Sequence, residues 1–155
     1  MPVECVSWHD CDTLFLKSLR ALTGLPFRLP TEAEWEFAAR GGCMSNGFEY
    51  SGSLFVDSVA WYSSTSKTTS HAVGLREPNE LGLYDMSGNV WEWCSDWYGS
   101  YSNAHAINPP GPYFGNFKVL RGGSWNREAK RCRVSNRYHA LPSVSSFGIG
   151  LRIAL

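Results

Sequence analysis

The chain has 155 residues, of which 43% are hydrophobic and 18% are charged. A chain of this length buries roughly two-thirds of its extended surface, which is enough for one compact domain but not for two of ordinary size. The hydrophobic content also excludes a disordered chain. Fourteen basic and fourteen acidic residues cancel, which argues against a nucleic-acid binder that releases counterions and against a polybasic membrane surface.

Nothing in the sequence predicts a membrane segment, a secretory signal or a structural zinc site. No run of about 18 apolar residues occurs, and residues 1–4 lack the basic and apolar regions of a signal peptide. The five cysteines are an odd number, widely spaced and without a CxxC pair, which favours free, buried thiols. We expect a cytoplasmic protein, or one exported by a route that the sequence does not show.

A first helix is predicted near the N-terminus. Ser7 and Asp10 have the spacing of a capping box, in which each side chain accepts a backbone hydrogen bond from the other residue. Apolar residues follow with helical period until Gly24 and Pro26 end the pattern. The predicted apolar stripe consists of Cys11, Leu14, Phe15, Leu19 and Leu22.

A second, shorter helix is predicted from another capping box, formed by Thr31 and Glu34. Its apolar residues are Trp35, Ala38 and Ala39. The pattern ends at residues 40–42, where two glycines follow an arginine. Because Glu32 and Glu36 lie one helical turn apart, we expect them to share a solvated face.

After residue 45 the composition changes to Gly, Ser, Asn, Pro and aromatic residues, with short stretches that alternate like strands. We predict strands at residues 90–93, 117–120 and 150–155 and loops at 63–70 and 103–115. Trp91 and Trp93 share one face of the first strand and are expected in the core. Two helices followed by short strands and long connections predict a single α+β domain with a high loop content.

Three stretches and the C-terminus carry a family resemblance. The stretches are RLPTEAEWEFAARGG at residues 28–42, GLYDMSGNVWEWCSDWY at 82–98 and VLRGGSW at 119–125. They resemble motifs of the formylglycine-generating enzyme, or sulfatase-modifying factor, family, and the closing GIGLRIAL resembles the last strand of that family. The resemblance implies a C-type-lectin-like fold with two N-terminal helices, small twisted antiparallel sheets and a loop-rich ligand face. It does not supply an activity, because functional sites are grafted onto folds.

The copper site of these enzymes is incomplete in this chain. The family's enzymes oxidise a sulfatase cysteine with copper held by two cysteines, and the resemblance places those positions at Arg127 and Cys132, counted from Ser124. A copper(I) ion needs paired thiolates, and the guanidinium of Arg127 repels a cation. We therefore expect no formylglycine-generating activity, no required cofactor and no catalytic residue. Cys132 is expected to be a packed thiol, with a reactive nucleophile as the alternative.

The resemblance also implies a candidate structural calcium site in the GNVWEW hairpin. The matching positions are Asp85 and Glu92 by side chain and Gly88 and Val90 by backbone carbonyl, an oxygen set that suits a hard cation. Two carboxylates are few for calcium. The alternative is that both carboxylates bind backbone amides of the turn at residues 87–89, without an ion.

The segment after Trp125 resembles the variable region of diversity-generating retroelement proteins, which use the same C-type-lectin scaffold. In those proteins, fixed elements such as RGGSW and CRVSNR alternate with clusters of asparagine codons that adenine-directed mutagenesis rewrites. Here the fixed elements are intact. All the residues between them except Glu128 can be reached from an asparagine codon, and Glu128 from a lysine codon. The positions are Asn126, Arg127, Glu128, Tyr138, His139, Ala140, Leu141, Ser143, Val144, Ser145, Ser146 and Phe147.

This second resemblance implies a non-catalytic protein of prokaryotic or viral origin that displays a diversified surface and binds a protein or glycan. Inward side chains of a strand can hold the frame while outward and loop positions vary. Tyr138, His139, Leu141 and Phe147 would then be exposed anchors for a ligand. Two alternatives stay open: Leu141 and Phe147 belong to an ordinary core, or the chain is an unvaried family member or an altered redox enzyme.

Overall fold

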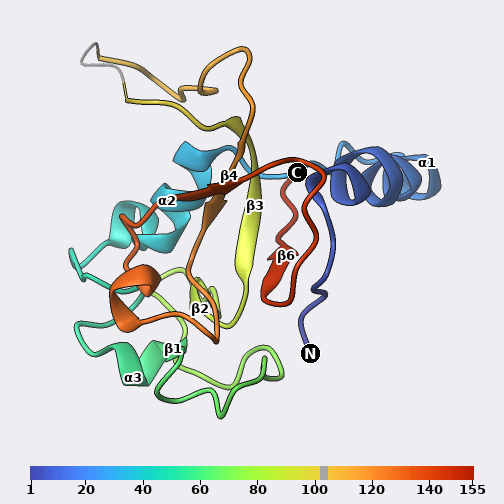
Figure 1. Ribbon diagram of the computed structural model, residues 1–155. Coiled ribbons are helices and arrows are strands. Elements are labelled where there is room, and N and C mark those ends of the chain that lie inside the picture. Colours follow the sequence, from blue (N-terminus) through green and yellow to red (C-terminus); the bar gives the residue numbers. More distant parts are fainter. Residues whose placement is uncertain (102–104) are drawn as a thin grey trace.

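The structure is a computed structural model that describes residues 1–101 and 105–155. The helical segments from η1 to α3 come first and the strands follow, with η3 between β4 and β5, in an α+β order with long irregular connections (Figure 1). The helical segments are η1 (Asp10–Leu16), α1 (Lys17–Thr23), α2 (Glu32–Ala39), η2 (Gly42–Met44), α3 (Val56–Val59) and η3 (Ala129–Cys132). The strands are β1 (Ala60–Trp61), β2 (Ser87–Gly88), β3 (Trp91–Trp97), β4 (Lys118–Arg121), β5 (Tyr138–Ala140) and β6 (Ile149–Leu151). No helix in these two ranges is both long and apolar enough to span a bilayer.

The main sheet has four strands in the order β5-β4-β3-β6. β3 pairs antiparallel with β4, with Trp93 opposite Leu120, and parallel with β6, with Trp93 opposite Leu151. β4 pairs antiparallel with β5, so that β5 forms one edge of the sheet. β1 and β2 form a separate parallel pair. The sheets are therefore mixed, where the sequence predicted antiparallel ones.

Helix α2 forms as predicted and covers one face of β3 and β4. The amide of Glu34 donates to Thr31 Oγ1 at 3.2 Å, and the amide of Thr31 donates to Glu34 Oε2 at 2.9 Å, so both halves of the capping box are present. Trp35 and Ala39 are buried against the sheet. The capping box thus fixes where the helix begins, and its apolar residues fix which side faces the sheet.

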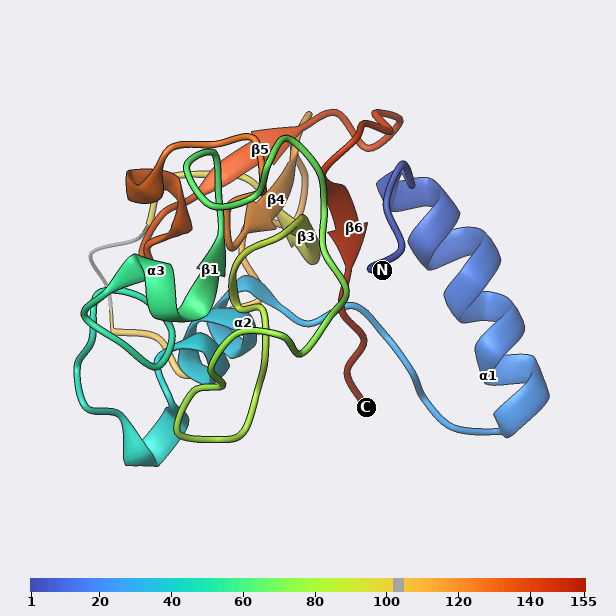
Figure 2. The same cartoon turned by 90° about the horizontal axis from the view of Figure 1, so that it is seen from below.

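The first helix begins after the predicted capping box, since Ser7 and Asp10 exchange hydrogen bonds of 2.9 and 3.1 Å. Its apolar stripe was predicted wrongly in part: Leu14, Phe15 and Leu22 are 63%, 48% and 85% exposed. The buried residues are Cys11 and Leu16. The helix opens with the π-helical segment η1, whose wider turns shift the helical period and bring Leu16 to the core side. In Figure 2, α1 lies at one side of the molecule, beyond β6.

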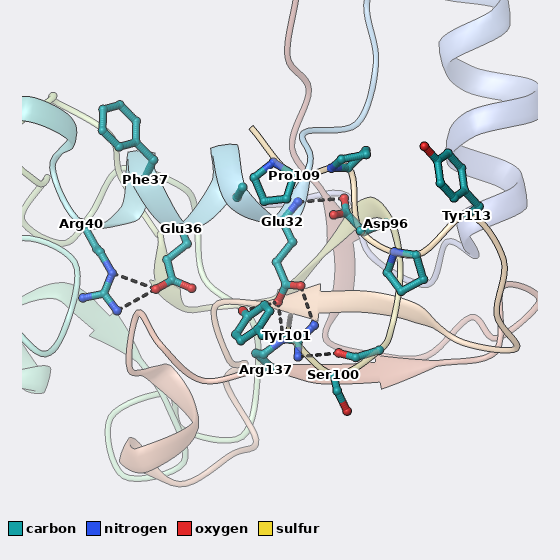
Figure 3. Close-up of a pocket in the computed structure, with 15 residues that line it drawn as sticks. Glu32, Glu36, Phe37, Arg40, Asp96, Ser100, Tyr101, Pro109, Tyr113 and Arg137 are labelled. Carbon is teal, nitrogen blue, oxygen red and sulfur yellow. Dashed lines mark hydrogen bonds and ion pairs between the residues drawn. The ribbon is translucent and has the colours of Figure 1, made fainter. Parts of the chain in front are cut away.

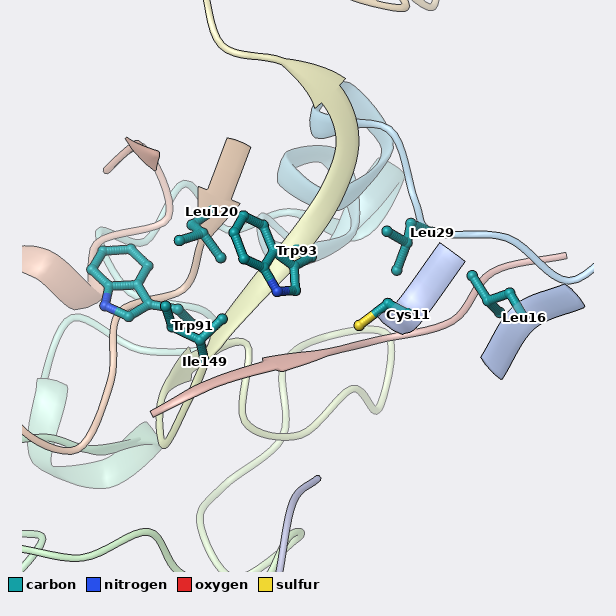
Figure 4. Packing of buried hydrophobic residues seen from close by; sticks show 7 residues of the cluster. All are labelled: Cys11, Leu16, Leu29, Trp91, Trp93, Leu120 and Ile149. Carbon is teal, nitrogen blue, oxygen red and sulfur yellow. The ribbon is translucent and has the colours of Figure 1, made fainter. Parts of the chain in front are cut away.

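The core around β3 is built on the two predicted tryptophans. Trp91 and Trp93 are buried together with residues of the first helix, β4 and β6 (Figure 4). The indole N–H of Trp93 donates to the carbonyl of Val6 at 3.0 Å, and that of Trp8 donates to the carbonyl of Cys94 at 2.9 Å. These bonds tie the N-terminal segment to the central strand.

The predicted strand boundaries need three corrections. β3 extends to Trp97 because both of its faces are covered, which hides the alternation that marks a half-buried strand. β4 begins at Lys118, which is buried with its ammonium 4.0 Å from the Trp8 ring and 3.9 Å from the Trp97 ring. β6 ends at Leu151, earlier than predicted. Of the predicted loop at 103–115, Asn103 and Ala104 lie outside the described residues.

The capping box of α2 gives a stability prediction. Replacing Thr31 by alanine removes the acceptor of the Glu34 amide and should lower the free energy of unfolding by about 1 kcal/mol, measured by urea denaturation. Thr13→Ala is the matched control, because the Thr13 hydroxyl donates only to the carbonyl of His9 on an exposed helix surface. Equal losses in the two variants would contradict a special role for the box.

Candidate functional site

The twelve predicted variable positions lie on the surface, and parts of the fixed elements between them are buried. Nine of the twelve are exposed and three, His139, Ala140 and Val144, are half-buried. The intervening frame, made of residues 121–124, Cys132, Val134 and residues 148–150, is buried. Leu141 and Phe147 are exposed, so the alternative that placed them in an ordinary core is wrong. That these positions bind a ligand stays a prediction.

The three variable stretches occupy one side of the molecule. Figure 2 shows η3, β5 and the loop at 141–147 in sequence along its upper side. We call this surface, formed by the twelve positions, the variable face. Backbone bonds fix it to the body: the amide of Ser63 donates to the carbonyl of Arg127 at 2.9 Å, and the amide of His9 donates to that of Pro142 at 3.3 Å. Because these bonds use main-chain atoms, they do not depend on which side chain occupies a variable position.

Two variable side chains of β5 rest on fixed aromatic residues. The Tyr138 ring stacks on Trp91 with the ring centroids 5.2 Å apart. The His139 ring lies 4.2 Å from Tyr98 and 4.9 Å from Phe117. Successive side chains of a strand point to opposite faces, so each meets its own aromatic neighbour. Positions 138 and 139 are therefore less free to change than the loop positions.

The RGG element holds the frame beneath the variable face. A Cβ atom at Gly123, whose φ is +83°, would lie 2.8 Å from the carbonyl oxygen of Arg131, so two backbone segments approach closely at this glycine. Arg121 is fully buried and donates to the carbonyls of Val134 at 2.8 Å and Asn136 at 2.9 Å. These contacts fix the chain on both sides of the turn that carries Asn126, Arg127 and Glu128.

The positions implied as copper ligands do not fit a copper ion. Arg127 is exposed, and Cys132 is buried in an apolar cluster with Tyr50, Val59 and Tyr62. Burial raises the pKa of Cys132 to about 12, so the thiol is protonated at physiological pH and is no thiolate ligand. Within the described ranges, no group of three or more His, Cys, Asp and Glu side chains could hold a metal ion.

The implied calcium site stays a prediction: Glu92 is paired with an arginine, whereas the buried Oδ1 of Asp85 has no hydrogen-bond partner among the described residues. Asp85 and Glu92 line the same cavity of about 600 Å³, together with Val90. The Glu92 carboxylate already accepts from Arg152 at 2.9 and 3.0 Å and from the Trp35 indole at 2.7 Å. Asp85 accepts from the amide of Gly74, outside the predicted turn, and its burial raises its pKa. Calcium takes six to eight oxygens, and the cation beside Glu92 is Arg152.

A second cavity, which the sequence did not predict, lies beside α2 (Figure 3). It has a volume of about 710 Å³ and is lined by residues of α2, by residues 99–101 and 109–113, by Asp96 and by Arg137. We call it the α2 cavity. None of the twelve variable positions lines it. Its walls come from four separate parts of the chain, and for that reason no local pattern marks it.

Glu32 and Glu36 do not share a solvated face, contrary to the sequence prediction. Glu32 is buried and accepts from Arg137 at 2.6 and 2.7 Å. Glu36 pairs with Arg40 and with the buried guanidinium of Arg121. Arg121 and Arg137 belong to β4 and to the segment before β5, which are far from α2 in sequence, whereas Arg40 directly follows the helix. Tertiary contacts thus convert a helix face that looks solvated into an ion-pair network.

Of the three carboxylates that line the α2 cavity, Asp96 is the one for which the described residues provide no ion pair with an arginine. It is 4% exposed, and its Oδ2 accepts from the amide of Glu32 at 2.8 Å at the first turn of α2. Within the described part of the chain, no lysine or arginine nitrogen lies within 4.0 Å of its carboxylate. Burial raises the pKa of Asp96. The motif SDWY contains this residue, but only the fold shows that it faces a cavity.

The burial of the thiols gives a second prediction. Cys5 and Cys43 are exposed, whereas Cys11, Cys94 and Cys132 are buried, so a thiol reagent should label two cysteines in the native protein and all five in denaturant. Copper should not change the native count, because Cys132 stays protonated and has no thiolate partner. Tight, stoichiometric copper binding that protects Cys132 from labelling would contradict this arrangement.

The chain has relatives of known name. All of it, residues 1–155, matches the model of the sulfatase-modifying factor enzyme 1-like domain. The formylglycine-generating enzyme of Streptomyces coelicolor is 35% identical over 171 residues, which cover 99% of this chain and 52% of that enzyme. The serine/threonine-protein kinase pkn1 of Chlamydia pneumoniae is 40% identical over 131 residues, 82% of this chain and 20% of the kinase. The chain thus spans about half, or less, of the length of these relatives.

Solved structures also resemble this chain over nearly its whole length. Treponema denticola variable protein 1 superposes with a TM-score of 0.91 at 32% identity, over 98% of this chain and 70% of that one. PvdO from Pseudomonas aeruginosa superposes with a TM-score of 0.85 at 29% identity, over 99% of this chain and 61% of that one. These likenesses confirm the predicted α+β, C-type-lectin-like fold. The chain belongs to the formylglycine-generating enzyme family, as a sulfatase-modifying factor enzyme 1-like domain.

Proposed function

We propose that the protein is a non-catalytic binding protein of the diversity-generating retroelement type, which recognises its ligand through the variable face. One observation carries the proposal: all twelve positions are exposed or half-buried, whereas residues 121–124, Cys132, Val134 and residues 148–150 of the fixed elements are buried. A surface of this kind can change its side chains while the body keeps its fold. The likeness to Treponema denticola variable protein 1 supports the same conclusion.

The alternative is an enzyme that resembles its formylglycine-generating relatives. Their names favour it. The residues at the implied copper positions argue against it, since Arg127 is a cation and the buried thiol of Cys132 has a pKa of about 12. The proposal includes no required cofactor.

The proposed ligand is a protein or a glycan. Tyr138, Leu141 and Phe147 are exposed, partly apolar groups of the sort that anchor ligands at binding surfaces. Nucleic acid is a poor candidate, because basic and acidic residues balance over the chain. The proposal includes a prokaryotic or viral source, in which a reverse transcriptase would rewrite the variable codons.

Tolerance to substitution tests the binding surface. Replacing Arg127, Leu141 and Phe147 together by serine should change the free energy of unfolding by less than about 1 kcal/mol, because all three are exposed. Val134→Ser is the control from the frame, and its buried side chain should make the loss about 2 kcal/mol or more. Collapse of the triple variant would contradict a surface built to vary.

The flanking DNA offers a test that needs no protein. We expect a reverse-transcriptase gene and a near-duplicate of the codons for residues 124–155, mismatched only where the duplicate has adenine. Related copies of the gene should differ almost solely at the codons of the twelve variable positions. A gene without such a duplicate, or copies that differ equally in the buried frame, would favour the unvaried family member.

A further inference from the structure

We propose that the α2 cavity binds a protonated lysine side chain of a partner protein. This would be a second recognition site, constant in sequence, and it goes beyond the proposed function because the variable face contributes nothing to it. The proposal rests on the size of the cavity, the character of its walls and one carboxylate at its base.

The cavity has the dimensions and walls of a binding site for a long, partly apolar group. Its volume of about 710 Å³ lies within the range of small-ligand sites, roughly 300 to 1,000 Å³. Phe37 from α2, Tyr101, Pro112 and Tyr113 contribute apolar and aromatic surface. Such walls suit the methylene stem of lysine, which packs on apolar surface while its ammonium reaches a polar group.

The charges of the cavity favour a cation. Three carboxylates line it, and two of them are matched: Glu32 by Arg137, and Glu36 by Arg40 together with Arg121. Asp96 forms no ion pair within 4.0 Å among the residues that the structure describes. The buried ammonium of Lys118 interacts with it only at longer range and donates instead to the carbonyl of Ser95 at 2.7 Å. A buried carboxylate without a direct ion pair is costly, and a bound ammonium would offset that cost. Anionic ligands are disfavoured for the same reason.

Gly111 leaves room beside this carboxylate. A Cβ atom at Gly111 would lie 3.0 Å from Asp96 Oδ1, so any side chain there would cover the carboxylate. Its φ of +74° also disfavours other residues. Glycine at this position keeps the loop wall close to Asp96 without placing a side chain over it.

Lysine fits better than arginine, because the place for a guanidinium is already taken. The guanidinium of Arg137 lies 4.6 Å from the Tyr98 ring and 4.0 Å from the Tyr101 ring and makes two hydrogen bonds to Glu32. The remaining carboxylate is that of Asp96. A single carboxylate suits the compact ammonium of lysine better than the planar guanidinium of arginine. Tyr113, at the rim, offers a further aromatic face to the cation.

The α2 cavity lies next to the variable face. Arg137, which lines it, directly precedes Tyr138 of β5. A partner could therefore insert a lysine into the cavity and still contact the variable side chains. In that arrangement the cavity would supply an affinity common to all copies of the protein, and the variable face would supply the discrimination between ligands.

The test uses the full chain and Nα-acetyl-lysine N-methylamide as the probe, followed by NMR shifts of the Gly99 and Gly111 amides. We expect saturable shifts that weaken with added salt, because an ion pair is screened. The Nε-acetylated analogue, which is neutral, should bind at least about tenfold more weakly. Equal binding of the two probes, or no saturation with the charged one, would overturn the proposal.

Two variants and a control complete the test. Asp96→Asn keeps an oxygen that can accept from the amide of Glu32 and should weaken binding of the charged probe about tenfold or more. Tyr113→Ala removes a 93% exposed ring and should weaken binding without affecting the fold. Glu77→Gln, an exposed carboxylate away from the cavity, is matched in charge to Asp96→Asn and should bind as the unchanged protein does. If Asp96→Asn also bound unchanged, the proposal would fail.

Discussion

The buried guanidinium of Arg121 connects the parts of this molecule that matter for function. Arg121 is the last residue of β4, and its guanidinium pairs with Glu36 on α2. The same guanidinium donates to the carbonyls of Val134 and Asn136 in the segment that leads to β5. Removing one partner of a buried ion pair typically costs about 3–5 kcal/mol, because the other charge is left unpaired. The sheet, the helix and the frame beneath the variable face therefore depend on one side chain.

This connection shows how the body of the protein is held without the side chains of the twelve exposed or half-buried positions. The frame is held by side chains that point inward, such as Arg121, and by backbone hydrogen bonds, such as that between Ser63 and Arg127. Neither depends on the identity of the exposed side chains. The exceptions are Tyr138 and His139, which pack on Trp91 and on Tyr98 and Phe117. Variation there should be restricted to residues that preserve some of this packing.

Family membership does not by itself give this chain a complete copper site, because the implied positions are Arg127 and Cys132. The relatives include enzymes by name, but of the two implied copper positions of this chain the first holds Arg127 and the second holds Cys132, whose thiol is fully buried. The α2 cavity, by contrast, is a concave site with matched and unmatched charges and aromatic walls. We have proposed that both the exposed face and the α2 cavity serve recognition.

The sequence alone determined the features that depend on near neighbours. The capping boxes of both helices and the burial of Trp91 and Trp93 follow from residue types and spacing, whereas the exposed positions after Ser124 were expected from the resemblance to diversity-generating retroelement proteins. The tertiary structure alone decided which apolar residues of the first helix are covered, that β6 runs parallel to β3, and that Glu32 meets Arg137. The physical reason is distance along the chain: Glu32 and Arg137 lie 105 residues apart, and no local pattern records a contact that only the folded backbone creates.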